Sequence, residues 1–168
     1  MPELQRLRTD HAPALLAFEQ ENRAYFAASI PDRGDAYFTD FAARLTDLLT
    51  EQAAGLCHFH LLVAPDGEVL GRFNLVDVAD GSADLGFRMA EKATRRGLAT
   101  ATVLHLCTLA ATEYGLTTLR ASAALDNTAS RTVLTRTGFI PTGEEVQLND
   151  RPGTGYVLDL RAPEIETR

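Results

Sequence analysis

The sequence is poor in the residues that build disulfide or metal frameworks. Its 168 residues include only two cysteines, Cys57 and Cys107, which lie far apart in apolar runs without the spacing of a metal site. Free cysteines are among the most buried residue types, so we expect both thiols in the core. A chain of this length buries a sizeable core without covalent cross-links. We therefore expect one globular domain over residues 1–168, without a bound metal.

Positive charge is also scarce. The chain has 16 Lys and Arg against 23 Asp and Glu, which gives a net charge of -7 and a pI near 5.0. Nucleic-acid-binding domains usually present a basic face, so this balance argues against a nucleic-acid partner. The same balance is compatible with a cationic substrate, although an acidic surface more often serves solubility.

Long apolar runs are missing as well. The longest uncharged stretch, residues 97–112, contains Thr and His and is too short for a membrane-spanning helix. The opening segment MPELQRLRTD has no apolar core of the kind that a secretory signal carries. We therefore expect a cytoplasmic protein that does not interact with membranes.

The hydrophobic pattern switches repeatedly between helical and strand-like periods. The expected elements are a strand at 4–7, helices capped by Asp10 and at 35–54, strands at 58–63, 68–78 and 83–90, a helix from about 98, a strand at 118–123, a helix at 126–137, and strands at 139–148 and 155–160, the last two joined by a loop that holds Asp150, Pro152, Gly153 and Gly155. One strand–helix–strand unit surrounds the central helix, so its two strands should be parallel neighbours. The sequence thus predicts an α/β protein with a mixed, mostly antiparallel sheet.

The stretch 94–115 organises the rest of the chain. Gly97 and small residues open an uncharged helix directly behind Arg95 and Arg96. Free N–H groups and the positive dipole end at a helix N-terminus favour an anion, and a glycine lets the backbone approach phosphate oxygens. Neither a GxGxxG motif nor a Gly-Lys-Ser/Thr phosphate loop is present. We interpret the stretch as a cradle for a cofactor pyrophosphate, followed by a buried helix. A solvated surface pair is the alternative for the two arginines.

A second polar feature follows one strand later. Asn127 and Ser130 lie three positions apart, on one face of the short helix at 126–137. Ligands of open sheets collect at the carboxyl ends of strands, where helices begin, so Ser130 can aim its hydroxyl toward a ligand there. The alternatives for these two residues are a helix cap and a solvated serine.

Taken together, LGFRMAEKATRRGLATATV and LDNTASRTVLTRTGFIPTGE resemble the GNAT superfamily of acyl-CoA-dependent N-acetyltransferases. The early segment ALLAFEQENRAYFAASIPDR is similar to the branch that acetylates the N-terminal alanine or serine of ribosomal proteins. The resemblance implies a seven-stranded, largely antiparallel sheet with helices on both faces. Its parallel strands splay apart and admit the pantetheine arm of acetyl-CoA. One departure is Thr94, where the family often has Gln or Arg.

The resemblance also implies which residues hold the cofactor. Backbone groups of Phe87, Arg88 and Met89 would pair with pantetheine, Asn127 would bond the cofactor arm, and Ser130 would lie near its sulfur. The residues expected around the pyrophosphate are Arg95, Arg96, Gly97, Leu98, Ala99 and Thr100.

Acetyl transfer to an amine needs an unprotonated amine, a polarised carbonyl and a protonated leaving thiolate. We expect a backbone N–H near Met89 to stabilise the oxyanion and Ser130 to deliver the proton to sulfur. Asp84, Glu144 and Glu145 are candidate bases that would act through water. An ordinary surface carboxylate is the alternative for each of them.

The acceptor is less narrowly defined than the acyl donor. An α-amino group has a pKa of about 8 against about 10.4 for lysine, so a weakly based site suits a peptide or protein N-terminus. Glu19, Asn22 and Arg23 on the first helix are candidate lining groups, with an exposed polar helix face as the alternative. A small amine such as an antibiotic or a polyamine, and a non-catalytic acyl-CoA sensor, remain open. The sequence also leaves open whether the chain forms a homodimer.

Overall fold

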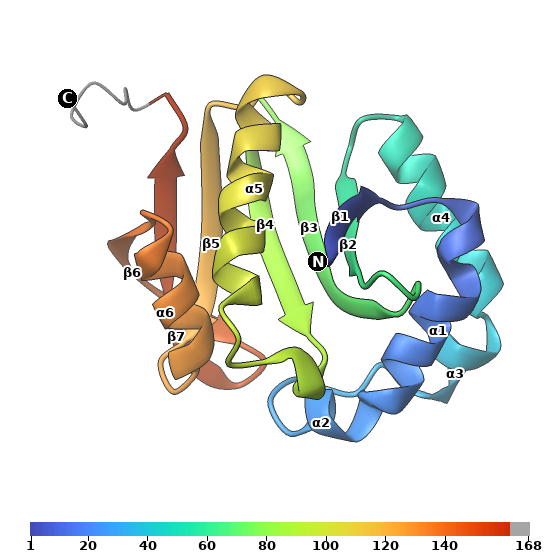
Figure 1. The fold of residues 1–168 in the computed structure, drawn as a ribbon. Coiled ribbons are helices and arrows are strands. Elements are labelled where there is room, and N and C mark those ends of the chain that lie inside the picture. Colours follow the sequence, from blue (N-terminus) through green and yellow to red (C-terminus); the bar gives the residue numbers. More distant parts are fainter. Residues whose placement is uncertain (162–168) are drawn as a thin grey trace. The chain divides into compact units, whose positions relative to one another are not determined.

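The structure is a computed structural model and describes residues 1–161. Figure 1 labels the helices and strands along the chain. By their contacts the described residues form two compact units: unit 1 comprises residues 1–76 and 86–99, and unit 2 comprises residues 77–85 and 100–161. Hydrogen bonds link seven strands in the order β1-β2-β3-β4-β5-β7-β6. The expected seven-stranded mixed sheet is therefore confirmed, and its strand β4 (Ser82–Met89) contributes residues to both units.

Unit 1 carries the N-terminal helices. Its elements are β1 (Glu3–Arg6), the 3-10 turn η1 (Thr9–His11), α1 (Ala12–Glu21), α2 (Arg23–Ala27), α3 (Asp35–Thr39), α4 (Phe41–Ala53), β2 (His58–Val63), most of β3 (Val69–Ala79), the end of β4 and the 3-10 turn η2 (Glu91–Ala93). Strand β2 pairs antiparallel with β1 and with β3. Helix α4 packs against α1 and β2, so these helices cover the strands with their apolar sides.

The two long N-terminal helices expected from the sequence are each interrupted once. The first breaks at Asn22, where the side chain Nδ2 donates to the Phe18 carbonyl and competes with the regular helix bonds. The second breaks at Asp40, between α3 and α4. Asp10 does not cap α1: it lies within η1, and His11 occupies the N-cap position without a side-chain cap bond.

The core of unit 1 holds the end of β4 close to β3. Phe73 and Leu75 on β3 are completely buried, and the Phe73 ring stacks on Phe87 with the ring centroids 5.7 Å apart. A Cβ at Gly71 would lie 2.7 Å from the Met89 sulfur. The glycine therefore favours this close approach of the last residue of β4, because a side chain at position 71 would require the Met89 side chain to move.

Unit 2 contains the parallel strand pair. Its elements are the first half of β4, α5 (Leu98–Thr112) from Thr100 onward, β5 (Thr118–Ala124), α6 (Thr128–Arg136), β6 (Ile140–Leu148) and β7 (Arg151–Asp159). Residues Ser82–Asp84 pair in parallel with residues 118–120, which confirms the expected strand–helix–strand unit. Strand β7 pairs antiparallel with both β5 and β6.

The closing hairpin is tighter than expected. Leu148 pairs with Arg151, so only Asn149 and Asp150 form the turn, with φ values of 50° and 70°. Two residues with positive φ match the twist of a hairpin, and Asn and Asp tolerate this conformation. Pro152, Gly153 and Gly155 lie inside β7, although the sequence predicted them in a loop. Proline and glycine are typical of loops, but Gly153 is needed in the strand for close packing. A Cβ there would lie 2.7 Å from the Ala123 carbonyl oxygen.

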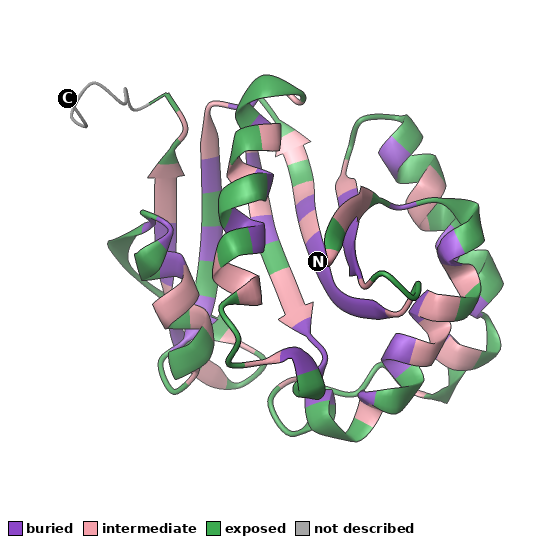
Figure 2. Ribbon diagram, viewed as in Figure 1, coloured by how far each residue is buried: buried purple, intermediate pink, exposed green. Residues whose placement is uncertain are grey.

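Helix α5 is buried on one side only, as Figure 2 shows. Val103 and Leu106 are completely buried, whereas Leu104 is 50% exposed, so the expectation of a wholly buried helix is wrong. An uncharged sequence reduces the cost of burial but does not enforce it. Cys57 and Cys107 are likewise only half-buried rather than core residues. Among the described helices, none has the length and apolar character to cross a membrane.

Candidate functional site

The connection from β4 to α5 has a backbone shape suited to an anion. Arg95 and Gly97 both have positive φ, 63° and 73°, and α5 begins directly afterwards at Leu98. A non-glycine residue with positive φ is uncommon and costs on the order of 1–3 kcal/mol, a strain typical of functional sites. Such left-handed residues occur in the concave backbone segments that bind anions. A Cβ at Gly97 would meet nothing within 4 Å, so the glycine is favoured there by its positive φ and not by a lack of space.

The two arginines ahead of α5 are exposed. Neither Arg95 nor Arg96 forms an ion pair within residues 1–161. Both guanidinium groups are therefore available to a phosphate, and the same exposure fits the surface alternative. The backbone of this segment, rather than its charges, is the more informative feature.

Side chains at the end of β4 are already occupied by packing in unit 1. Phe87 stacks on Phe73, Met89 is buried, and the Arg88 guanidinium lies over the Phe26 ring, 4.5 Å from its centroid. A ligand at these three positions would therefore meet the backbone, as the family resemblance implies.

In unit 2, Asn127 caps helix α6. Its Oδ1 accepts a hydrogen bond from the Ser130 backbone N–H at 3.1 Å. The helix-cap alternative therefore holds for Asn127, while its Nδ2 makes no hydrogen bond to the described residues and stays available to a ligand. Ser130 is half-buried, and its hydroxyl likewise has no partner in the described part of the chain.

The candidate bases of unit 2 lie on its surface. Asp84 is 44% exposed and pairs with Arg120, with 3.3 Å between Oδ1 and Nε. Glu144 and Glu145 are exposed on β6, beside the register shift that separates Pro141 from Glu145. The structure therefore places all three where the surface-carboxylate alternative would place them. Residues 1–161 hold no cluster of three or more His, Cys, Asp or Glu that would bind a metal.

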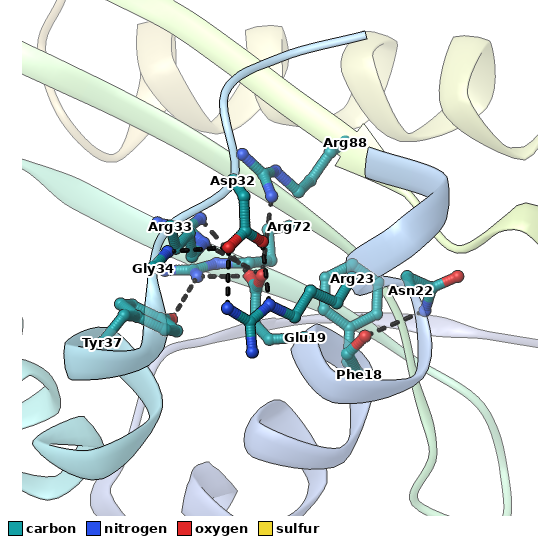
Figure 3. Close-up of polar contacts among 10 residues, drawn as sticks. All are labelled: Phe18, Glu19, Asn22, Arg23, Asp32, Arg33, Gly34, Tyr37, Arg72 and Arg88. Carbon is teal, nitrogen blue, oxygen red and sulfur yellow. Dashed lines mark hydrogen bonds and ion pairs between the residues drawn. The ribbon is translucent and has the colours of Figure 1, made fainter. Parts of the chain in front are cut away.

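One of the three candidate acceptor residues, Glu19, lies in a buried ion cluster in unit 1 (Figure 3). Glu19 is only 1% exposed, so the exposed-face alternative is wrong for it. Its carboxylate accepts hydrogen bonds from Arg72 at 2.7 Å and Arg33 at 3.0 Å, and it pairs with Arg88 at 3.5 Å. Arg72 also donates to the Tyr37 hydroxyl at 3.2 Å. One carboxylate thus joins residues of α1, the segment before α3, β3 and β4.

The charges of this cluster shift the titration of its members. Burial alone would raise the pKa of Glu19, but the positive charges of Arg72 and Arg33 outweigh it and lower the pKa. Burial, reinforced by the charge of Arg33, lowers the pKa of Arg88 to about 10. At neutral pH the cluster therefore holds three guanidinium cations around one carboxylate.

Asn22 and Arg23 have different partners. Asn22 is also buried, and its Oδ1 accepts a hydrogen bond from the Glu91 backbone N–H at 3.0 Å, which ties the end of α1 to η2. Arg23 is about one-third exposed and binds both carboxylate oxygens of Asp32, at 2.9 and 2.7 Å, as well as Asp35 at 2.8 Å. These hydrogen bonds lower the pKa of Asp32 to about 2.

The sequence prediction missed Asp32, Arg33 and Arg72. Arg72 had a detectable signal, since it is a single charge inside the apolar strand segment VLGRFNLV, and a charge at such a position is almost always paired. Arg33 lies in an irregular segment and carries no comparable signal.

Comparisons with known proteins agree with this architecture. A family model described as acetyltransferase (GNAT) domain matches residues 3–140. A search of curated protein sequences finds no significant match.

Several solved structures share the fold. The ribosomal-protein-S5-alanine acetyltransferase from Vibrio fischeri has a TM-score of 0.89 and 16% sequence identity, covering 96% of this chain and 94% of that chain. Mycobacterium smegmatis RimJ in complex with CoA-disulfide has a TM-score of 0.82 and 22% identity, covering 93% and 80%. A variant of the spermidine N-acetyltransferase SpeG from Vibrio cholerae has a TM-score of 0.77 and 12% identity, covering 99% of both chains. Because the family model covers most of the chain, this protein belongs to the acetyltransferase (GNAT) family, the acyl-CoA-dependent N-acetyltransferases that its sequence resembles.

Proposed function

We propose that the protein transfers the acetyl group of acetyl-CoA to the α-amino group of a protein N-terminus. The observation that carries the proposed use of acetyl-CoA is the segment from Arg95 to Leu98, with its two left-handed residues directly ahead of a fifteen-residue helix. Structures that share the fold include one bound to a coenzyme A disulfide and one named for the acetylation of a ribosomal-protein alanine.

The residues of this chain fit coenzyme A as a ligand. Residues 95–100 would hold the pyrophosphate through backbone N–H groups, assisted by the exposed guanidinium groups of Arg95 and Arg96. The backbone of residues 87–89 would pair with the pantetheine arm, since the side chains there are packed. Asn127 would donate from its unused Nδ2 while its Oδ1 caps α6.

Acetyl-CoA supplies the activated thioester, and the protein supplies groups that handle protons. The Ser130 hydroxyl would donate a proton to the departing sulfur, and a backbone N–H near Met89 would stabilise negative charge on the carbonyl oxygen. Asp84 or Glu145 would accept the amine proton through water. Because an α-amino group has a pKa of about 8, it loses its proton more readily than a lysine does, and a weakly basic exposed carboxylate suffices as the proton acceptor.

A small amine is the second candidate acceptor, since the spermidine acetyltransferase SpeG shares the fold. The two alternatives differ in charge near the reacting nitrogen, because a polyamine carries several cations whereas a peptide N-terminus is followed by a neutral backbone. An assay of thiol release with both kinds of acceptor separates them.

The test is thiol release from acetyl-CoA with a panel of acceptors. Peptides that begin with Ala, Ser or Thr should be turned over, and mass spectrometry should place the acetyl group on the α-nitrogen. Turnover of spermidine or an aminoglycoside without turnover of any peptide would contradict the proposed acceptor. Tight binding of CoA without turnover of any amine would instead indicate an acyl-CoA sensor.

A further inference from the structure

A small cavity in unit 1 lies beside the Glu19 cluster. Its volume is about 10 Å³, which is room for one water-sized group. Three arginines and two carboxylates provide its polar lining, namely Arg23, Arg33, Arg88, Glu19 and Asp32. The cavity therefore has an excess of positive charge, in a chain whose net charge is -7.

The excess charge belongs to Arg33 and Arg88. Arg23 is neutralised by two hydrogen bonds to Asp32, and it also binds the exposed Asp35. The remaining carboxylate, Glu19, is bound most closely by Arg72, which is 6% exposed and is not part of the cavity lining. Within residues 1–161 the Nε of Arg72 has no hydrogen-bond partner, so even the buried part of the cluster has an unused donor.

Arg33 and Arg88 are held in place by aromatic rings. The Arg33 guanidinium lies 4.6 Å from the centroid of the Tyr37 ring, and that of Arg88 lies 4.5 Å from the Phe26 ring. Arg33 uses Nε and Nη2 on Glu19, whereas Arg88 reaches Glu19 with Nη1 only, at 3.5 Å. Since a guanidinium has five N–H donors, both arginines retain donors for a second anion in a preorganised arrangement.

We propose that Arg33 and Arg88 bind a carboxylate of the acceptor, so that the enzyme prefers amines with an acidic group close to the reacting nitrogen. This rests on the proposed function, in which a backbone N–H near Met89 stabilises the thioester carbonyl oxygen, so that the attacking amine comes close to the end of β4, next to Arg88. A carboxylate oxygen has the size of the water that the cavity admits. The side chains of Arg23 and Arg33 are 36% and 31% exposed, so the cavity is reached from solvent.

The inferred substrate class is a peptide N-terminus with Asp or Glu at the second or third position. Its carboxylate would meet two guanidinium groups, a pairing that is planar and strong. A polyamine or an aminoglycoside would instead bring further cations to a cavity whose lining already has an excess of positive charge. The acidic net charge of the whole chain therefore does not describe this site.

The test uses three peptides that begin with Ala and continue with Glu, Gln or Lys and are otherwise identical. We expect kcat/KM for the Glu peptide to exceed that for the Gln peptide about 10- to 100-fold, the worth of a charge-assisted hydrogen bond, and the Lys peptide to be poorest. Arg33→Gln should reduce the preference to a few-fold, and Arg33→Lys should retain part of it. Arg8→Gln is the control, because Arg8 is exposed, lies outside the Glu19 cluster and does not line the cavity.

Binding of the acetylated products separates this inference from the proposed function. Titration calorimetry with the N-acetylated Glu and Gln peptides, in the presence of CoA, reads the subsite without turnover. Tighter binding of the acidic product, lost in Arg33→Gln, supports the subsite. Equal affinity and equal turnover of the acidic and neutral peptides would overturn it. Failure of every amine to release thiol would count against the proposed function alone.

Discussion

Replacement of Glu19 by glutamine is the sharpest test of the buried cluster. The substitution preserves the size of the side chain and one hydrogen-bond acceptor but removes the negative charge. Glu19 is 1% exposed and its closest partner, Arg72, is 6% exposed, so solvent cannot replace the lost charge beside Arg72. Three guanidinium groups would then face one another without a counterion.

The expected loss of stability follows from that burial. Removing one partner of a buried ion pair costs about 3–5 kcal/mol, and the lower end applies because glutamine still accepts a hydrogen bond. For a chain of this length, 1 kcal/mol corresponds to roughly 2–4 °C in Tm, so Glu19→Gln should melt about 6–12 °C lower. Adding Arg72→Met should recover part of the loss, because an apolar side chain needs no counterion.

The assay is thermal unfolding followed by circular dichroism at several pH values. The folded-state pKa of Glu19 lies below its ordinary value of 4.5, so the stability it contributes is complete above that value and is lost as the pH falls through the folded pKa. The gap between the wild type and Glu19→Gln should therefore be constant near neutral pH and narrow below about pH 4.5. Glu21→Gln, an exposed neighbour on α1, should change stability by no more than about 0.5 kcal/mol.

Two results would refute this reasoning. A Glu19→Gln protein within about 1 kcal/mol of the wild type would mean that the cluster relaxes and hydrates its charges without a counterion. A gap that stays the same from pH 7 to pH 3 would mean that the lost stability comes from packing rather than from the ionised carboxylate.

Three further substitutions test the donor side. Gly97→Val should weaken CoA binding at least tenfold in a folded protein, because a β-branched residue disfavours φ near 73°. Unchanged CoA affinity by calorimetry would show that the pyrophosphate does not bind at this segment. Ser130→Ala should lower kcat about 10- to 100-fold with nearly unchanged CoA affinity, and an unchanged kcat would remove the hydroxyl from proton transfer. Asn22→Ala should raise the KM for acetyl-CoA several-fold because Glu91 loses its hydrogen-bond acceptor, whereas Asn22→Asp should retain most of the wild-type KM; equal KM values for both would contradict a positioning role.

The strands were predictable because their signals are local. Alternating apolar residues and the Pro-Asp-Gly turn at 65–67 are visible within a few positions, and each is confirmed by β2 and β3. The helix breaks had no such signal, since the amphipathic period continues through Asn22. At that break Asn22 Nδ2 donates to the Phe18 carbonyl, and Oδ1 of the same side chain accepts from Glu91, which lies 69 positions away and can be recognised as a partner only in the folded chain.

The same distinction applies to the candidate site. The segment around Gly97 could be singled out because a glycine, two arginines and an uncharged helix are adjacent in the sequence. Glu19 was identified as a polar residue of interest, but its role as the centre of a charge cluster was not predictable. Its partners Arg33, Arg72 and Arg88 are 14, 53 and 69 positions away, and only tertiary packing brings them together.

Within unit 1, the end of α1 contacts both the proposed acceptor subsite and the segment that leads to the proposed coenzyme A site. Glu19 holds Arg88 on β4, and Asn22, three residues later, holds Glu91 at the start of η2. Glu19 and Asn22 therefore both hold the start of the segment that leads from Met89 to the cradle at Arg95–Gly97. An acceptor carboxylate bound to the spare donors of Arg88 would act on the segment that is proposed to bind coenzyme A. Acceptor and donor affinity should then be coupled, and the Kd of CoA measured with and without an acidic product peptide gives the size of that coupling.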